Sequence, residues 1–383
     1  MSTRLSRRQL ALAALTPALP AAEPVYKSAL DNFESKVDVD TFDPVIYARK
    51  RYDQMPMRLT FPGAKNAKQA EAWQKRFREK LFELVGPFPH PRDLLKPQTL
   101  EVREFPAYRR EKFVVETRPG VGLLGYLLTP KSGKAPYAPM ICLPGHGRGV
   151  DDIVGIDDKG RDRTDKAGYQ HDFAVQAVER GMAAVAIEQM AFGCRRDPKA
   201  KARSLGNASC MPVAGAAFLL GETMIGWRAF DVSRVCDWIE TRQELDSKRI
   251  GCMGISGGGT ATLFSAALEL RIRLAFVSGY LCTFKESIFS LAHCIDNYVP
   301  GILHWGEMYD VAGLIAPRPL FIESGDKDNI FPVDAARESY EKTKRVYEAF
   351  GVADHCQQEV FSGEHSFHGV KGLEFAVRHL LRA

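Results

Sequence analysis

The chain has 383 residues, of which 45% are hydrophobic and 26% charged, with 8 cysteines and a formal net charge of +5. The normal apolar content excludes an intrinsically disordered protein, and the low cysteine content excludes a disulfide-dense scaffold. Without the charges of Arg4, Arg7 and Arg8 the net charge is about +2, which is too weak to favour a nucleic-acid partner. The length suits one large α/β domain or two smaller domains.

The first 22 residues have the layout of an export signal. Basic side chains within residues 1–9 precede an apolar stretch at 10–19 and the small residues Ala21 and Ala22. The apolar stretch is far shorter than the roughly 20 residues that span a bilayer, so we expect no membrane span. We predict that residues 1–22 direct export to the periplasm or the cell exterior.

Residues 6–10, Ser-Arg-Arg-Gln-Leu, resemble the bacterial twin-arginine signal, which exports proteins that have already folded. The cleavage site is poorly defined, since the segment has no clean Ala-x-Ala sequence. The alternative is an unprocessed N-terminal tail.

Residues 23–95 are expected to form an N-terminal segment ahead of a catalytic domain at 96–383. Residues 23–60 show little periodicity and are expected to wrap over the surface. Apolar side chains between residues 67 and 85 recur at three- and four-residue steps, which predicts an amphipathic helix. Prolines between residues 87 and 91 are expected to end that helix.

The segment 100–129 changes to short runs of β-branched, aromatic and aliphatic residues. Apolar runs at 113–115 and 123–128 are separated by Arg-Pro-Gly at 118–120, which is a turn signal. We therefore predict antiparallel strands in this part of the chain.

After Pro130, short apolar runs alternate with longer helical patterns. The expected strands are 140–143, 183–187, 250–253, 274–277, 320–322 and a weaker one around 360–361. The expected helices are at about 168–180, 221–242, 258–270, 333–350 and 370–382. Strands that alternate with helices predict βαβ units. The predicted fold class is α/β, with a mostly parallel central sheet, antiparallel leading strands and helices on both faces.

A candidate nucleophile follows the strand at 250–253. Residues 254–258 read Gly-Ile-Ser-Gly-Gly and precede a helical pattern, so the G-x-S-x-G motif stands in its strand-turn-helix context and indicates Ser256. The glycines are needed because side chains at the flanking positions would collide with neighbouring backbone. The alternative is a glycine-rich structural turn.

A serine hydroxyl needs a base to take its proton and a carboxylate to orient that base. Residues 325–332, Gly-Asp-Lys-Asp-Asn-Ile-Phe-Pro, follow the strand at 320–322. Their order of Gly, two residues, Asp and a later Pro resembles the hydrolase pattern and favours Asp328 over Asp326. Glu323 is less suitable because it falls within or at the end of the strand, and the alternative for the whole stretch is a polar turn.

The base is expected after the last strand, where the sequence offers His365 and His368. His365 stands two residues after Gly363, which is the usual placement of a hydrolase histidine. His368 is the alternative, or a supporting group. His379 lies in the terminal helical pattern and is expected to pack or to face solvent.

Acyl transfer also requires donors for the oxyanion. One is expected to be the backbone N–H of Gly257, which follows the nucleophile. The second is the N–H of His146, or less suitably Gly147, in the Pro-Gly-His-Gly loop after the strand at 140–143. The His146 side chain is then not a base, and no second ligand at metal-binding spacing accompanies it, so we predict no metal site.

The cysteines show no close metal-ligand spacing either. Two pairs are candidates for a disulfide in an exported protein, namely Cys282 with Cys294 and Cys194 with Cys210.

With these motifs the chain resembles the α/β-hydrolase superfamily, and within it the acetyl xylan esterase-like branch, which is related to dienelactone hydrolases. Beyond the triad the resemblance rests on three stretches, namely residues 188–196 (EQMAFGCRR), 294–301 (CIDNYVPG) and 316–320 (APRPL). It covers roughly residues 65–383 and implies the α/β-hydrolase fold. Pro144 is a departure, since many hydrolases place His before the oxyanion glycine.

The stretches also contain candidates for substrate binding. Arg195 and Arg196 are candidates to hold a sugar hydroxyl or a substrate carboxylate, with a structural salt bridge as the equal alternative. Trp305 and Trp227 are candidates to stack on a sugar ring, and core packing is the alternative for both.

We therefore expect a serine carboxylic-ester hydrolase that uses Ser256, Asp328 and His365 and requires no metal or organic cofactor. The resemblance and the export signal imply a small-molecule or polysaccharide ester as substrate, with acetyl groups on polysaccharide or oligosaccharide favoured. One alternative is a small-ester or lactone hydrolase of the dienelactone type, although that branch commonly uses Cys as its nucleophile. The other is a non-catalytic carbohydrate-binding protein. The oligomeric state is left open.

Overall fold

A computed structural model describes residues 28–89, 94–290 and 293–382. The chain separates into two compact units, residues 1–47 and residues 48–383. The predicted export signal at 1–22 lies outside the described residues. The first unit holds the short 3₁₀ helices η1 (Glu34–Lys36) and η2 (Val39–Phe42) and the start of α1 (Pro44–Gln54).

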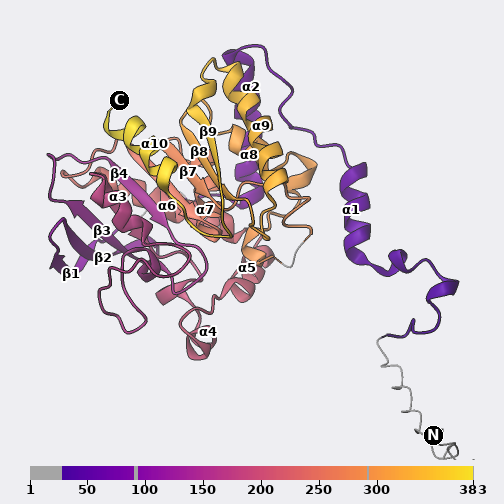
Figure 1. The fold of residues 1–383 in the computed structure, drawn as a ribbon, viewed down its shortest axis with the longest axis horizontal. Helices are drawn as coiled ribbons and strands as arrows, with labels where there is room; N and C mark the ends of the chain where they lie inside the picture. Colours follow the sequence, from indigo (N-terminus) through magenta and orange to yellow (C-terminus); the bar gives the residue numbers. More distant parts are fainter. Residues whose placement is uncertain (1–27, 90–93, 291–292, 383) are drawn as a thin grey trace, which may run out of the picture. The chain divides into compact units, whose positions relative to one another are not determined.

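The second unit is built on one nine-stranded sheet in the order β1-β2-β3-β5-β4-β6-β7-β8-β9 (Figure 1). The strands are β1 (Gln98–Glu104), β2 (Tyr108–Arg118), β3 (Val121–Pro130), β4 (Pro139–Leu143), β5 (Ala183–Ile187), β6 (Ile250–Ile255), β7 (Ile272–Ser278), β8 (Leu320–Gly325) and β9 (Cys356–Phe361). Pairs from β1 to β5 are antiparallel, and every pair from β5 to β9 is parallel. This is the predicted mixed sheet with antiparallel leading strands.

The antiparallel end of the sheet follows its turn and burial patterns. Gly120 has a positive φ of 74° in the tight turn between β2 and β3, a conformation that glycine adopts without a steric cost. β2 alternates between buried and half-buried positions along most of its length, as a strand with one covered face does. β1 is exposed throughout and forms an edge of the sheet.

Helices cover both faces of the sheet. The helices that follow α1 are α2 (Ala67–Val85), α3 (Phe173–Glu179), α4 (Pro198–Arg203), α5 (Cys210–Leu219), α6 (Met224–Glu240), α7 (Gly257–Leu268), α8 (Met308–Gly313), α9 (Val333–Ala349) and α10 (Val370–Leu381). Ile141 and Leu143 of β4 share one core with α2, α6, α7, α8 and α9, whereas Met140 and Cys142 share the other with α3 and α10. Alternate residues of one strand therefore reach opposite layers, which explains why β4 is apolar along its whole length.

Helix α2 confirms the predicted amphipathic helix, and it belongs to the same compact unit as the sheet. Its apolar stripe is buried in the core beside α6, α7 and α9. The sequence-based boundary at residue 96 therefore separates α2 from the unit in which it packs. An amphipathic stripe indicates that a helix has a buried face, but it does not say which part of the chain covers that face.

The expected helices after Pro130 are present as α3, α6, α7, α9 and α10. Helices α4, α5 and α8 have 6, 10 and 6 residues and were not predicted. One or two turns carry too few positions to establish a 3.6-residue period.

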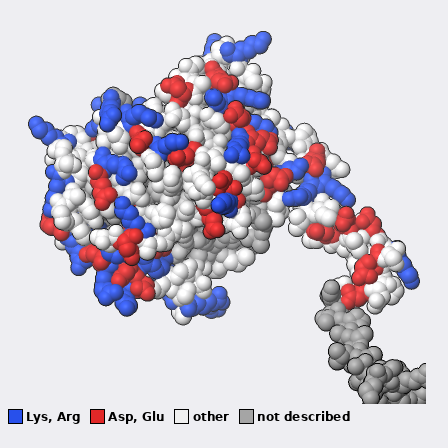
Figure 2. All heavy atoms as spheres, in the orientation of Figure 1, with Lys and Arg blue, Asp and Glu red and all other residues white. Residues whose placement is uncertain are grey.

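Charges on the face shown in Figure 2 are mixed, with acidic and basic side chains interspersed over the surface. In the part of the chain that the structure describes, no single helix is long and apolar enough to cross a membrane. The pair α5 and α6 passes the same length and composition test together, although the two helices meet at 96°.

Candidate active site

Ser256 occupies the sharp turn between β6 and α7. Its φ of 57° and ψ of −123° are unusual for a residue with a side chain and mark a strained turn. A Cβ atom on Gly258 would collide with the backbone carbonyl oxygen of Leu143 in β4, and one on Gly254 would lie 2.5 Å from the Gly258 oxygen. The glycines of the motif are therefore required by close backbone approach.

His365 and Asp328 are brought together by the loops that follow β9 and β8. The Nδ1 atom of His365 lies 2.7 Å from Oδ2 of Asp328. The other carboxylate oxygen, Oδ1, accepts the backbone N–H groups of Ile330 at 2.8 Å and Phe331 at 3.1 Å. Both oxygens of this buried carboxylate are thus occupied, which fixes the orientation of the imidazole ring.

The second ring nitrogen of His365, Nε2, is buried and has no hydrogen-bond partner among the described residues. His365 and Ser256 line the same cavity of about 500 Å³. Tyr169 lines this cavity as well. The ring of Tyr169 stacks on His365 at 5.7 Å between centroids, and the ring of Phe331 also stacks on it at 5.7 Å.

The two predicted oxyanion donors lie on different segments, His146 in the loop after β4 and Gly257 at the start of α7. Gly257 is the first residue of α7, where a backbone N–H has no partner within the helix. Tyr169 donates its hydroxyl to the backbone oxygen of His146 at 2.6 Å, and the Gly145 N–H donates to Oε1 of Gln170 at 2.7 Å. Gln189 donates its side-chain amide to the Pro144 oxygen. Three side chains therefore fix this loop, and of these only Gln189 lies in a stretch that the sequence singled out, residues 188–196.

The alternative acids and bases support the same loops. Asp326 is exposed and accepts the Gly363 N–H at 2.9 Å. Glu323 is buried and accepts the N–H groups of His368 at 2.9 Å and Gly369 at 2.6 Å. His368 stacks on Phe361 and does not line the catalytic cavity. His365, and not His368, therefore lines the cavity that Ser256 also lines.

The three substrate-binding candidates do not line the catalytic cavity. Arg195 is buried and donates to Asp231 at 2.7 Å, and Arg196 is buried and donates to the backbone oxygens of Gly193 and Asn207 at 2.7 and 2.9 Å. Trp305 packs against the core, with Lys80 over its ring at 4.3 Å. Each of these side chains is held by protein groups, which favours the structural alternative over substrate contact for all three.

Trp227 also lies outside this cavity and donates its indole N–H to Glu222. The cavity is lined by the predicted residues, by members of the stretches 294–301 and 325–332, and by Tyr169 and His293, which no motif indicated. The lining residues are His146, Tyr169, Ser256, Gly257, His293, Cys294, Asn297, Asn329, Ile330, Phe331 and His365. Among these lining residues there is no Lys or Arg.

Glu188 is a buried carboxyl group directly after β5, and its oxygens accept the Val150 N–H at 3.2 and 3.3 Å. Burial raises the pKa of Glu188 to about 8, against the opposing effects of backbone N–H groups and of Arg195. A raised pKa means that the folded state favours the neutral carboxyl group. The protonated Glu188 therefore stabilises the folded state fully below the unfolded-state pKa near 4.5. This stabilisation decreases as pH rises and is lost once pH passes the folded-state pKa of about 8.

We expect the wild-type protein to lose stability between pH 5 and pH 8 relative to Glu188→Gln, by on the order of 2 to 4 kcal/mol. Urea unfolding of both proteins at the two pH values measures this difference. Glu323, whose pKa burial raises to about 7, is present in both proteins and cancels in the comparison. The exposed Glu374→Gln variant is the control, and an identical pH dependence in Glu188→Gln and wild type would contradict the expectation.

Comparisons with known proteins identify the family of the chain. The model of the Abhydrolase family matches residues 47–364. The Bacillus subtilis (strain 168) protein named "Putative hydrolase YtaP" is 27% identical over 318 residues, which cover 79% of this chain and 97% of that protein.

Two solved structures share the fold. A "putative acetyl xylan esterase" from Bacteroides fragilis matches with a TM-score of 0.69 and 21% identity, over 84% of this chain and 82% of that chain. A glucuronoyl esterase from Solibacter usitatus matches with a TM-score of 0.58 and 15% identity, over 85% and 98% of the two chains. At these identities the likeness extends to the fold alone. The mixed sheet, the strained serine turn and the match over most of the chain lead to one conclusion: the chain is an α/β hydrolase that belongs to the Abhydrolase family.

Proposed function

We propose that the chain is a serine carboxylic-ester hydrolase in which Ser256 is the nucleophile, His365 the general base and Asp328 the carboxylate that orients the base. The observation that carries this proposal is the difference between the two ring nitrogens of His365. Its Nδ1 is bound to Asp328 at 2.7 Å, while its Nε2 is buried without a partner in the cavity that also contains Ser256. An imidazole held in this way is ready to accept a proton at Nε2.

The reaction would follow a two-step route. The Ser256 oxygen attacks the ester carbonyl carbon while its proton moves to Nε2 of His365. The N–H groups of Gly257 and His146 stabilise the oxyanion, and the imidazolium then gives its proton to the departing alcohol. Water attacks the acyl-enzyme in the second step while His365 takes its proton, and the imidazolium returns this proton to the Ser256 oxygen as the carboxylic acid is released.

The proposed substrate is an acetyl ester on a polysaccharide or oligosaccharide. The cavity is of a size that holds a small ester with part of its alcohol. Because its lining residues include no Lys or Arg, it has no fixed cation for a substrate carboxylate and suits an uncharged ester. The names of the structural neighbours, an acetyl xylan esterase and glucuronoyl esterases, are consistent with a carbohydrate ester.

Acetate release from acetylated xylan by the purified protein tests this proposal, with a small aryl acetate as the general esterase substrate. We expect release from both substrates. Cleavage of the aryl acetate or of a lactone without release from xylan would favour the dienelactone-type alternative. Inactivity on all of these substrates, with retained binding to the polysaccharide, would favour a carbohydrate-binding protein.

Export remains part of the proposal, because a polysaccharide substrate lies outside the cytoplasm. Fractionation of the native host, with mass spectrometry of the mature N-terminus, tests whether residues 1–22 are removed.

A further inference from the structure

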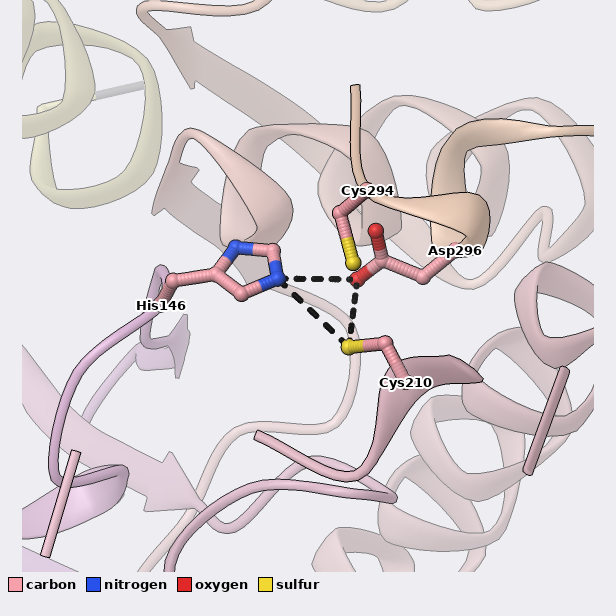
Figure 3. A group of neighbouring side chains, drawn as sticks. All are labelled: His146, Cys210, Cys294 and Asp296. Carbon is pink, nitrogen blue, oxygen red and sulfur yellow. Dashed lines mark hydrogen bonds and ion pairs between the residues drawn. The ribbon is translucent and has the colours of Figure 1, made fainter. Parts of the chain in front are cut away.

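Four side chains with metal-ligating atoms converge beside the catalytic cavity (Figure 3). His146 comes from the loop after β4, and Cys210 is the first residue of α5. Cys294 and Asp296 come from the segment at η5 (Ile295–Asn297). The ligating atoms of all four lie within 4.8 Å of one another, and Figure 3 shows them directed toward a common space.

The distances in this cluster are too long for good hydrogen bonds between its oxygen and nitrogen atoms. Nε2 of His146 lies 3.6 Å from Oδ2 of Asp296, whereas an N–H···O hydrogen bond spans about 2.7 to 3.2 Å. The Cys210 sulfur lies 3.5 Å from each of those two atoms. The three atoms therefore form a nearly equilateral triangle, in which the Cys210 thiol is within sulfur hydrogen-bond distance of both other atoms.

These distances match the edges of a tetrahedral metal site. Bonds of about 2.3 Å from zinc to sulfur and about 2.0 to 2.2 Å to nitrogen or oxygen place two ligands about 3.3 to 3.8 Å apart. All three measured separations fall within that range. The Cys294 sulfur supplies the fourth ligand, and a set of two thiolates, one imidazole and one carboxylate suits Zn²⁺.

The charges of the surrounding residues also fit a dication. With both thiols deprotonated and the imidazole neutral, the ligands carry three negative charges. Zn²⁺ and the buried guanidinium of Arg228, whose Nη1 lies 2.6 Å from Oδ2 of Asp296, supply three positive charges. The buried cluster is then neutral as a whole, which avoids the cost of an unpaired buried charge. Asn297 donates to the other oxygen of Asp296 at 3.3 Å and helps to orient it.

The alternative to metal binding is a disulfide bond between Cys210 and Cys294. It would account for the thiols alone and would leave His146 and Asp296 at their 3.6 Å separation with no shared partner. A metal ion accounts for the convergence of all four side chains. The metal is therefore the better explanation of the geometry.

We propose that His146, Cys210, Cys294 and Asp296 bind one Zn²⁺ ion that holds the oxyanion loop beside the catalytic serine. Coordination through Nε2 would leave the proton of His146 on Nδ1, the nitrogen that would lie 3.1 Å from a Cβ atom on Gly257. The ion has a positioning role, and the ester-hydrolysis steps do not pass through it. The proposal concerns metal binding and does not depend on the esterase assignment.

The metal content of the full chain tests the proposal directly. After equilibration with ZnCl₂ and removal of free metal, we expect one Zn²⁺ per chain by mass spectrometric metal analysis. The Cys210→Ser/Cys294→Ser variant should retain less than about a tenth of that amount, because it lacks both thiolates. Cys194→Ser, which alters an exposed thiol outside the cluster, is the matched control and should retain the metal.

Two measurements on the unaltered protein keep the proposal testable even if the double variant does not fold. Loading with CoCl₂ should give the thiolate-to-cobalt charge-transfer band and the intense d–d bands of tetrahedral cobalt. Removal of Zn²⁺ with a chelator should increase hydrogen exchange in the peptide that contains residues 144–150. Absence of bound zinc and of the cobalt bands, or a Cys210–Cys294 disulfide in peptides of the protein purified without reductant, would overturn the proposal.

Discussion

Replacing Ser256 with alanine is expected to lower kcat for ester hydrolysis by about 10⁴- to 10⁶-fold while the protein remains folded. The large loss follows because no other hydroxyl at the turn between β6 and α7 can take the place of the Ser256 oxygen. Alanine keeps the same Cβ atom at the positive-φ position, so the turn is under no more strain than in the wild type. Initial rates on an aryl acetate and on acetylated xylan measure the effect.

Ser362→Ala is the matched control, because Ser362 is exposed and lies in the loop of His365. Its rates should stay within about twofold of wild type. Equal thermal unfolding midpoints of wild type, Ser256→Ala and Ser362→Ala would show that the loss of activity in Ser256→Ala arises from the missing hydroxyl and not from unfolding. Near-normal hydrolysis by a folded Ser256→Ala protein would rule out Ser256 as the nucleophile.

Replacing His365 with alanine should have a similarly large effect, a loss in kcat of about 10⁴- to 10⁶-fold. His365 combines a 2.7 Å contact between Nδ1 and the buried carboxylate of Asp328 with an Nε2 atom that has no partner among the described residues, and it lines the cavity of Ser256. His368 stacks on Phe361 outside that cavity, and its side-chain exposure of 38% shows that it is half in solvent. We expect His368→Ala to change kcat by less than about tenfold.

The pair of variants separates the two histidines that the sequence offers as base. Rates of His365→Ala and His368→Ala are compared on the same substrate, with circular dichroism to confirm folding. If His368→Ala lost most of its activity and His365→Ala did not, the roles would be reversed. Loss in both would indicate that the His368 ring, which stacks on Phe361, also positions the loop.

The sequence predicts those site residues that stand in a motif of a few consecutive residues. Ser256 stands in a strand-turn-helix motif whose glycines are required by backbone contacts within and beside the motif itself. Asp328 and His365 each follow a predicted strand in a short polar segment. Parallel strands place their carboxyl ends at one edge of the sheet, so residues after β8 and β9 meet near the residue after β6.

The strand order determines which other side chains reach the site, and that order depends on packing over the whole unit. Because β4 lies between β5 and β6, the loop after β4 meets Tyr169 and Gln189 from segments far away in the chain. Arg195 follows a strand on the expected side, but the buried carboxylate of Asp231 binds its guanidinium. The position of an arginine in the sequence does not predict which carboxylate will bind its guanidinium in the folded protein.

The sequence by itself therefore determined the fold class, the nucleophile motif and the order of the candidate triad, because periodicity and turn chemistry act over a few residues. Only the tertiary structure decided that α2 packs in the catalytic unit and that the proposed substrate-binding arginines are held by protein groups. It alone brought His146, Cys210 and Cys294 together from three separate segments. Those contacts join residues far apart in the chain, and their free energy arises only when the whole core has formed.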